Sequence, residues 1–187
     1  MSILRKIYPF LLDTLQTFLM AAAVFLVIYI FLFRPFEVKG ESMYPNFLDK
    51  EYVLTNLIGL RFGEPKLGEV IVFKAPPDPE KDFIKRVIGT PGDTVMVKDG
   101  HVYLNGNLLD ESAYLKSDVK TYGGAFLKED TSITVPPDNF FVMGDNRLYS
   151  SDSREWGFVN RNLIIGRSFL VYWPINDIKV VNNPYSR

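Results

Sequence analysis

The chain has 187 residues, 47% of them hydrophobic, and a net charge of −1, which suits one ordinary domain with a short additional segment. The sequence has no basic stripe for nucleic acid, and the absence of cysteine excludes disulfides, thiol catalysis and cysteine-ligated zinc. The single histidine, His101, is too little for the usual zinc ligand sets, so we expect no metal and no cofactor.

The first predicted element is a membrane-spanning helix. Residues 14–33 form a run of 20 residues without a charged side chain. As a helix this run would extend about 30 Å, the thickness of the hydrocarbon core of a bilayer. The alternative is a cleavable signal peptide, which Ala21-Ala22-Ala23 would suit. However, the apolar run continues well past these alanines, whereas the apolar core of a signal peptide spans only about 7–15 residues.

The remaining residues, 34–187, are typical of a domain built from short strands. Residues 94–98 and 101–104 flank Asp99-Gly100, which is a strong signal for a two-residue β-hairpin turn. No long amphipathic helix is evident in this part of the chain. We therefore predict a mainly β fold, an antiparallel β-sheet catalytic domain preceded by one N-terminal transmembrane helix. The polar, turn-rich stretch at about 98–138 is expected to be a cap-like insertion.

One serine and one lysine are the candidates for catalysis. Ser42 follows the apolar run by about nine residues, so its site should lie near a membrane surface. A serine hydroxyl needs a base, and His101 sits beside a hairpin turn, where a surface position is the simpler interpretation. Lys85 has apolar neighbours, and full burial lowers a lysine pKa from about 10.4 by about 3–5 units. The commoner roles for these two residues are a turn serine and an exposed strand lysine.

Three sequence blocks, taken together, resemble the bacterial type I signal peptidases, which are membrane-anchored serine proteases. The blocks are Gly40-Glu-Ser-Met-Tyr-Pro45, Phe83-Ile-Lys-Arg-Val-Ile-Gly89 and Gly144-Asp-Asn-Arg-Leu-Tyr-Ser-Ser-Asp-Ser-Arg154. The resemblance extends from the apolar run to about Gly166. It implies an endopeptidase that removes signal peptides from exported preproteins by cutting after small residues in an Ala-x-Ala pattern. In that reaction Ser42 would be the nucleophile and Lys85 the general base.

The resemblance also implies supporting roles for polar residues of the third block. Those residues are Asp145, Asn146, Arg147, Ser150, Asp152 and Arg154. Ser150 would orient Lys85, Asp152 and Arg154 would form an ion pair, and the other three would be structural. A bidentate pair between an arginine and a carboxylate would make this loop rigid. The simpler alternative is a solvated polar loop.

The substrate pocket and the oxyanion site are predicted in the same way. The resemblance places Val38, Met43 and Ile84 near a shallow apolar pocket that would admit alanine and reject bulky side chains. Gly40 stands where some members of the family have a serine that donates to the oxyanion. This chain lacks that donor, so the backbone N–H of Ser42 is the one candidate, and a second donor is unidentified.

The sequence departs from the family pattern at two positions. Asn46 replaces the usual threonine after the proline of the first block, and Glu69 replaces the usual aspartate before a strand. Neither residue is a proposed catalytic group, so we expect these changes to alter the fine geometry rather than the activity.

The location and the partners follow from the resemblance rather than from charge. Positive charges are nearly balanced across the apolar run, with Arg5 and Lys6 before it and Arg34 and Lys39 after it. The resemblance implies a single-pass protein of the bacterial cell membrane, with residues 1–13 in the cytoplasm and the catalytic domain outside. A thylakoid or mitochondrial membrane is the alternative. The expected partners are signal-peptide-bearing preproteins and the lipid bilayer, without nucleic acid, and the oligomeric state stays undefined.

Three other functions are compatible with parts of the sequence. A self-cleaving repressor-type protease shares the serine–lysine chemistry but needs a DNA-binding domain, and here the N-terminal segment is apolar. A catalytically silent, membrane-tethered β module that binds exported proteins would typically lack Ser42 or Lys85. A specialised peptidase with one dedicated substrate is not distinguished from a general enzyme by the sequence.

Overall fold

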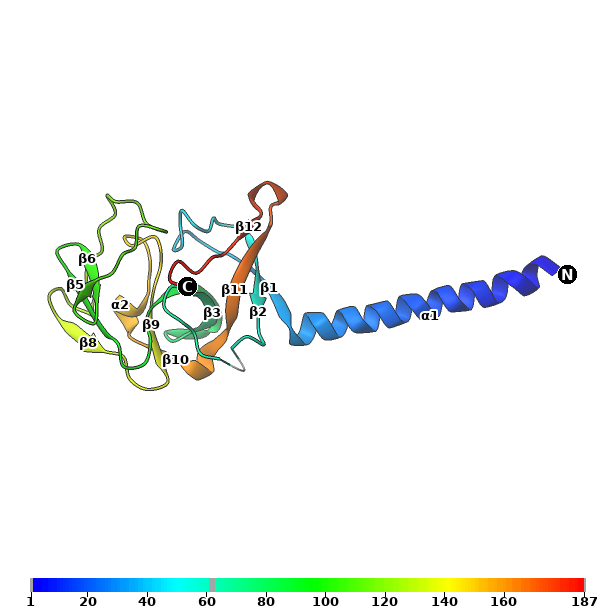
Figure 1. The fold of residues 1–187 in the computed structure, drawn as a ribbon, viewed down its shortest axis with the longest axis horizontal. Helices are drawn as coiled ribbons and strands as arrows, with labels where there is room; N and C mark the ends of the chain where they lie inside the picture. Colours follow the sequence, from blue (N-terminus) through cyan, green and yellow to red (C-terminus); the bar gives the residue numbers. More distant parts are fainter. Residues whose placement is uncertain (1, 61–62, 187) are drawn as a thin grey trace.

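The computed structural model describes residues 2–60 and 63–186, and consists of a long N-terminal helix and a β domain (Figure 1). Helix α1 (Ser2–Phe31) projects from the domain, and its segment Ile7–Tyr29 is long and apolar enough to cross a membrane. Large side chains such as those of Phe18 and Phe25 are exposed along it. The helix begins before the predicted start at residue 14. It ends at Phe31 because strand β1 begins at Phe33 and pairs with β2.

The main sheet is antiparallel, with the strand order β1-β2-β11-β3-β4-β9-β10, and β12 pairs with β11. Its strands are β1 (Phe33–Glu37), β2 (Tyr52–Asn56), β3 (Val70–Ala75), β4 (Asp78–Gly89), β9 (Asn139–Met143), β10 (Val159–Asn160), β11 (Ile164–Trp173) and β12 (Lys179–Val180). Between them lie the short helices α2 (Ser153–Trp156), η1 (Arg161–Leu163) and η2 (Ile175–Asp177). This arrangement confirms the predicted fold class of an antiparallel β domain behind one N-terminal helix.

A second, smaller sheet overlaps the stretch predicted as a cap, of which residues 109–131 carry no strand. Its strand order is β7-β6-β5-β8, with β5 (Thr94–Lys98), β6 (His101–Leu104), β7 (Asn107–Leu108) and β8 (Ser132–Thr134). The turn between β5 and β6 has positive φ angles of 53° at Asp99 and 79° at Gly100. Two successive positive φ angles match the twist of a tight hairpin, which explains why the Asp-Gly pair marked this turn in the sequence. The sheet begins at Thr94, a few residues before the predicted start of the cap.

Alternating side chains on the central strands hold the two sheets together. On β4, Val87 packs into a core beneath the main sheet, while the next residue, Ile88, packs into a core shared with β5 and β8. On β9, Val142 and Met143 divide between the same two cores. Because strand side chains alternate between faces, β4 and β9 are buried on both sides. The central strand β4 is therefore a rigid support for the side chains that it carries, among them Lys85.

Candidate active site

The first block forms a loop that is closed at its base. It leaves β1 at Val38 and returns to β2 at Glu51, and reciprocal backbone hydrogen bonds join Val38 to Lys50 and Glu51. Met43 is fully buried, in a core with Val53 and Val171. Gly40 has a φ of +83°, a conformation that a residue with a side chain adopts with strain. The loop is therefore held at both ends and from below, and Ser42 has a fixed position.

Lys85 reaches Ser42 from β4. Its Nζ lies 2.7 Å from the Ser42 Oγ, and it also donates to the Ile84 carbonyl at 3.0 Å. The side chain is buried, with 3% exposure, and its Nζ lies 5.0 Å from the centroid of the Phe83 ring. Two residues separated by 43 positions in the sequence thus form one hydrogen-bonded pair.

The surroundings of Lys85 favour its neutral amine. Burial lowers the pKa of Lys85 to about 8, although the nearby carboxylates of Asp152 and Asp145 oppose this by favouring the charged form. Desolvation dominates because it disfavours a charge in an apolar environment, and neither carboxylate contacts Nζ. A lysine with a pKa near 8 is partly neutral close to physiological pH, so its nitrogen can accept a proton.

The third block passes directly behind the Ser42 loop. The Asn146 N–H donates to the Ser42 carbonyl at 3.0 Å, and the Asn146 Nδ2 donates to the Glu41 carbonyl at 3.0 Å. A Cβ atom at Gly144 would collide with the Ser42 carbonyl and the Ser150 side chain, so this close approach requires glycine. Asn146 therefore positions the backbone of Ser42, a contact more specific than the structural role predicted from the sequence.

Asp152 and Arg154 lie together beside this contact. The Arg154 Nε and Nη2 each lie 2.8 Å from an Asp152 oxygen, and the Gly144 N–H donates to the same carboxylate at 3.0 Å. Burial alone would raise the pKa of Asp152, but the Arg154 guanidinium outweighs burial and lowers it. The carboxylate stays charged and fixes the backbone at Gly144, where the third block turns towards Ser42.

Ser150 occupies a different environment from the one predicted. Its Oγ is buried beside Gly144 and close to the Asp152 carboxylate, whose pKa it helps to lower, and it makes no contact with Lys85 among the described hydrogen bonds. The Lys85 amine bonds to Ser42 and to the Ile84 carbonyl instead. The orientation of Lys85 by Ser150 is therefore not part of this geometry and stays a prediction.

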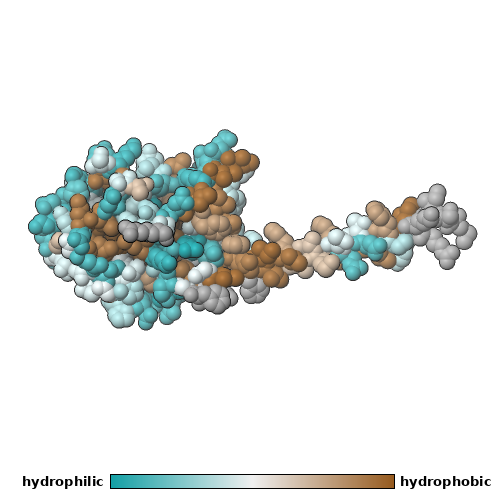
Figure 2. All heavy atoms as spheres, viewed as in Figure 1, coloured by the Kyte–Doolittle hydropathy of each residue, from teal (hydrophilic) through white to brown (hydrophobic). Residues whose placement is uncertain are grey.

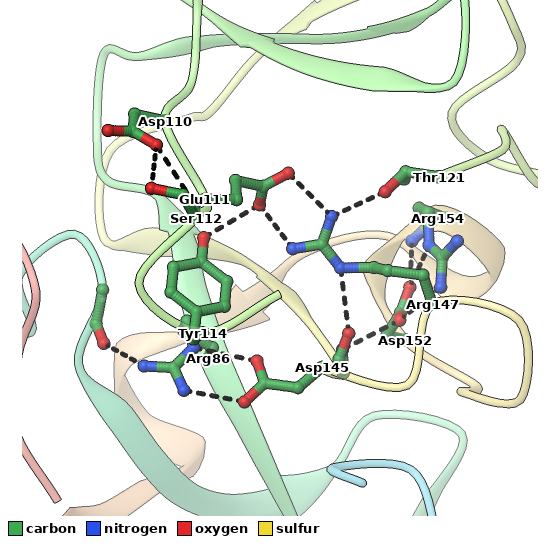
Figure 3. A network of polar contacts seen from close by, with 12 residues as sticks. Arg86, Asp110, Glu111, Ser112, Tyr114, Thr121, Asp145, Arg147, Asp152 and Arg154 are labelled. Atoms are coloured by element: carbon green, nitrogen blue, oxygen red, sulfur yellow. Dashed lines mark hydrogen bonds and ion pairs between the residues drawn. The ribbon is translucent and has the colours of Figure 1, made fainter. Parts of the chain in front are cut away.

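Arg86 and Asp145 form a buried pair on the opposite face of β4 from Lys85. Arg86 bonds to Asp145 twice, at 2.8 Å through Nε and 2.7 Å through Nη2, and its guanidinium lies 4.1 Å from the centroid of the Tyr114 ring (Figure 3). Asn46, which stands where the family usually has threonine, donates to the same carboxylate at 2.9 Å and so has a specific contact of its own. The sequence assigned Arg86 no supporting role, although it adjoins Lys85 in a matched block.

Arg147 connects the third block to the cap segment. It bonds to Glu111 through Nη1 and Nη2, at 3.0 and 2.5 Å, and to the Thr121 hydroxyl at 2.7 Å (Figure 3). Its side chain is fully buried, so the charge is stable there only because of these partners. Glu111, Tyr114 and Thr121 were missed because the polar segment that carries them offers no periodic pattern.

We expect Glu111→Ala to lower the free energy of unfolding by about 3 kcal/mol, since it leaves the buried Arg147 charge without its carboxylate. The matched control is Glu64→Ala, because Glu64 is largely exposed and pairs with Arg161 on the surface. That variant should lose less than about 1 kcal/mol. Denaturant unfolding of the full-length protein in detergent measures both values. Equal losses would mean that the buried pair does not hold the cap segment.

A cavity of about 790 Å³ runs beside the Ser42–Lys85 pair. Both residues line it, together with β1 and the loop that follows, and Val38 and Ile84 contribute apolar wall. Met43, the third predicted pocket residue, is fully buried and does not line the cavity. A peptide could lie in this cavity with a carbonyl carbon against Ser42, so the arrangement suits cleavage of an extended chain.

Comparison with known proteins agrees with this geometry. The sequence profile of the family described as signal peptidase, peptidase S26, matches residues 11–173. The chain therefore belongs to the signal peptidase family, as the three blocks indicated, and is a serine peptidase. Signal peptidase IB of Staphylococcus aureus (strain MRSA252) is 34% identical over 186 residues, covering 92% of this chain and 96% of the relative. Signal peptidase I S of Bacillus subtilis (strain 168) is 35% identical over 176 residues, covering 92% and 94%.

A solved structure gives a weaker likeness. The signal peptidase I from Enterococcus faecalis V583 has 30% sequence identity and a TM-score of 0.46, and the match covers 56% of this chain and 97% of that one.

Proposed function

We propose that this enzyme removes signal peptides from exported preproteins, with Ser42 as the nucleophile and Lys85 as the general base. The observation that carries the proposal is the 2.7 Å contact between Lys85 Nζ and Ser42 Oγ, made by an amine that is buried and has a pKa of about 8. A serine beside an ordinary exposed lysine would not be activated, because that amine would stay protonated near neutral pH.

The reaction would proceed in two steps. In the first, the neutral Lys85 amine takes the Ser42 hydroxyl proton while Oγ attacks the carbonyl carbon of the scissile bond. The tetrahedral intermediate then collapses: the carbon–nitrogen bond breaks, and Lys85 returns the proton to the leaving amine of the mature protein. In the second step, water gives a proton to Lys85 and attacks the acyl ester. The bond between the acyl carbon and Oγ then breaks, and Lys85 returns the proton to Oγ, which frees the signal peptide and regenerates Ser42 and the neutral amine.

The oxyanion and the supporting residues complete this proposal. The Ser42 N–H has no acceptor among the described residues, so it is free to donate to the oxyanion. Asn146 holds the Ser42 backbone, and the pairs Asp152–Arg154 and Arg86–Asp145 make the surrounding segments rigid. Ser150, whose buried hydroxyl lies beside Gly144 and near Asp152, would orient Lys85 once the lysine leaves the Ser42 hydroxyl during the reaction.

Specificity for Ala-x-Ala would come from the walls of the large cavity. Val38 and Ile84 are aliphatic residues on its lining, and Met43 closes the core below them. Aliphatic side chains at this part of the lining would favour a small apolar side chain such as that of alanine. Charged residues, among them Lys81 and Asp82, line other parts of the cavity, so this selection would act only where Val38 and Ile84 form the wall.

Membrane anchoring by α1 would place the site next to the bilayer. Only a short strand and the loop of the first block separate the end of α1 at Phe31 from Ser42. The edge of the β domain nearest α1 carries apolar residues continuous with the helix (Figure 2). At the β11–β12 turn these include Trp173, Ile175 and Ile178, each at least 50% exposed. We propose a single-pass protein of the bacterial membrane with an N-terminus in the cytoplasm, an anchor within α1 and an extracytoplasmic β-rich domain with a cap.

The test is cleavage of a model preprotein with an Ala-x-Ala site by the full-length protein in lipid, with the cut mapped by mass spectrometry. We expect one cut after the final alanine, none in a substrate with tyrosine in place of that alanine, and none with the Ser42→Ala enzyme. Cleavage by Ser42→Ala would exclude Ser42 as the nucleophile. If folded wild type cleaves no member of a panel of unrelated preproteins, the general activity is wrong, and a peptidase with one dedicated substrate or a silent module becomes the better description.

A further inference from the structure

A second hollow, with a volume of about 450 Å³, adjoins the site at Ser42. Two chain segments line first one hollow and then the other. In the first block, Gly40, Glu41 and Ser42 line the large cavity, and the next residues, Tyr44 and Pro45, line the second hollow. In the third block, residues 145–148 line the second hollow, whereas Tyr149 and Ser151 line the large cavity. The nucleophile therefore stands at the boundary between the two, and we call the second hollow the cap cleft.

The two hollows differ in their distance from the anchor. The large cavity is lined by residues 34–37, which follow α1 almost directly. The cap cleft has residues 115–122 as one wall, and in Figure 1 this segment lies farther from α1 than β1 does. A signal peptide held in the bilayer would reach Ser42 along the large cavity. The chain on the other side of the scissile bond would then leave along the cap cleft.

The wall of the cap cleft is held in place by buried polar contacts. Glu111 lies just before this wall and Thr121 lies near its end, and both bond to Arg147 at the base of the cleft (Figure 3). Tyr114 packs its ring on the Arg86 guanidinium just before the wall begins. Because these contacts fix both ends of the wall, the cleft is already formed without a bound peptide, which lowers the entropy cost of binding.

The lining of the cap cleft combines exposed apolar side chains with charged ones. Tyr44, Tyr122 and Leu148 expose 53%, 55% and 62% of their surfaces, and a group of exposed apolar side chains around one hollow marks a binding surface. Lys116 and Lys120 form no salt bridge with a described carboxylate, and Lys120 contacts the His101 ring. With Asp118, these lysines leave the lining an excess of one positive charge.

We propose that the cap cleft binds the first residues of the mature polypeptide, immediately after the scissile bond, and favours apolar and acidic side chains there. This inference rests on the proposed peptidase activity. It adds a binding site for the part of the substrate after the scissile bond, which the large cavity does not hold. Preproteins with the same Ala-x-Ala site would then be cleaved at different rates according to the start of the mature sequence.

The test compares two preproteins that differ only at mature residues two to four, which are glutamate in one and lysine in the other. The full-length enzyme in lipid is used as wild type and as the double variant Lys116→Glu/Lys120→Glu. We expect wild type to give the glutamate substrate a kcat/KM about two- to fivefold higher, the range expected for exposed ion pairs. The double variant should prefer the lysine substrate. The matched control is Lys98→Glu/Lys128→Glu, which makes the same change in net charge outside the cleft and should keep the wild-type preference.

The outcomes separate this inference from the activity on which it rests. A reversal in the double variant alone supports the cap cleft as the site. Cleavage of both substrates at equal rates by wild type, or the same preference in wild type and the double variant, overturns the cap cleft while leaving the peptidase intact. Failure of wild type to cleave either substrate contradicts the proposed activity, and the cap cleft inference falls with it.

Discussion

Lys85→Met is expected to reduce kcat/KM by about 10²–10⁴-fold, which is the usual contribution of a general base. Methionine fills a similar volume and preserves the apolar contacts of the buried lysine stem, but its side chain cannot accept the Ser42 proton. The measurement is cleavage of the Ala-x-Ala preprotein by the full-length enzyme in lipid. The control Lys98→Met, on β5 of the second sheet, removes a half-exposed lysine and should keep nearly full activity.

The pH dependence of wild type is part of the same prediction. The base must be neutral, and burial lowers the pKa of Lys85 to about 8. Wild-type kcat/KM should therefore be constant above pH 8 and fall about tenfold for each pH unit below it. In Lys85→Met the small residual rate should not show this acidic limb of the pH profile, the fall in kcat/KM below pH 8. A wild-type limb near pH 10, or the same limb in the methionine variant, would contradict the assignment of Lys85 as the base.

Stability gives an independent check on the lysine. Between pH 8 and about 10.5 the unfolded chain holds a proton on Lys85 that the folded protein has released, so stability rises with pH across that window. Below pH 8 the folded protein carries an unfavourable buried charge, which costs roughly 3 kcal/mol. Lys85→Met should thus unfold at a higher temperature than wild type at pH 7 while keeping only its small residual activity. A lysine needed only for structure would give the opposite change in unfolding temperature.

The parts of the fold and site that the sequence could predict are those that depend on near neighbours. The apolar run indicated α1, and Asp99-Gly100 indicated the hairpin between β5 and β6, because each signal lies within the element it specifies. The pair of Asp152 and Arg154, two residues apart, was implied by the resemblance to the family, and the structure contains it. Strand order could not be predicted, since β11 lies between β2 and β3, and only the folded core selects that place.

Long-range polar pairs were also beyond the sequence. Arg86 bonds to Asp145 across 59 positions, and Arg147 bonds to Glu111 across 36. Every one of these residues belongs to a type that is usually exposed, so nothing in the local sequence marks it as buried. The matched blocks drew attention to Asp145 and Arg147, but their partners became visible only with the structure. The contact predicted between Ser150 and Lys85 is absent from the described geometry.

Asp145→Ala is expected to lower the free energy of unfolding by about 3–5 kcal/mol, because it leaves the buried Arg86 guanidinium without a counter-charge. Arg86 would keep only the Gly68 carbonyl and the Tyr114 ring as partners. The matched control is Asp82→Ala, which removes the partner of the partly exposed Lys74 and should cost less than about 1 kcal/mol. Denaturant unfolding in detergent measures both variants.

The double variant Arg86→Met/Asp145→Leu distinguishes an unpaired charge from a loss of packing. Apolar residues of similar volume need no counter-charge, so the double variant should recover much of the stability that Asp145→Ala loses. A double variant as unstable as the sum of its single changes would contradict the explanation by an unpaired charge.

Activity separates the structural effect of this pair from its electrostatic effect on Lys85. The Asp145 carboxylate raises the pKa of Lys85, in opposition to burial. Its replacement by the neutral amide in Asp145→Asn should therefore move the limb of kcat/KM below pH 8. The buried pair would then have two opposed effects. It holds the segment behind Ser42 in place, and its carboxylate raises the pKa of Lys85, which makes the lysine harder to deprotonate. A variant that loses stability while its limb stays at pH 8 would show that Asp145 acts on the fold alone.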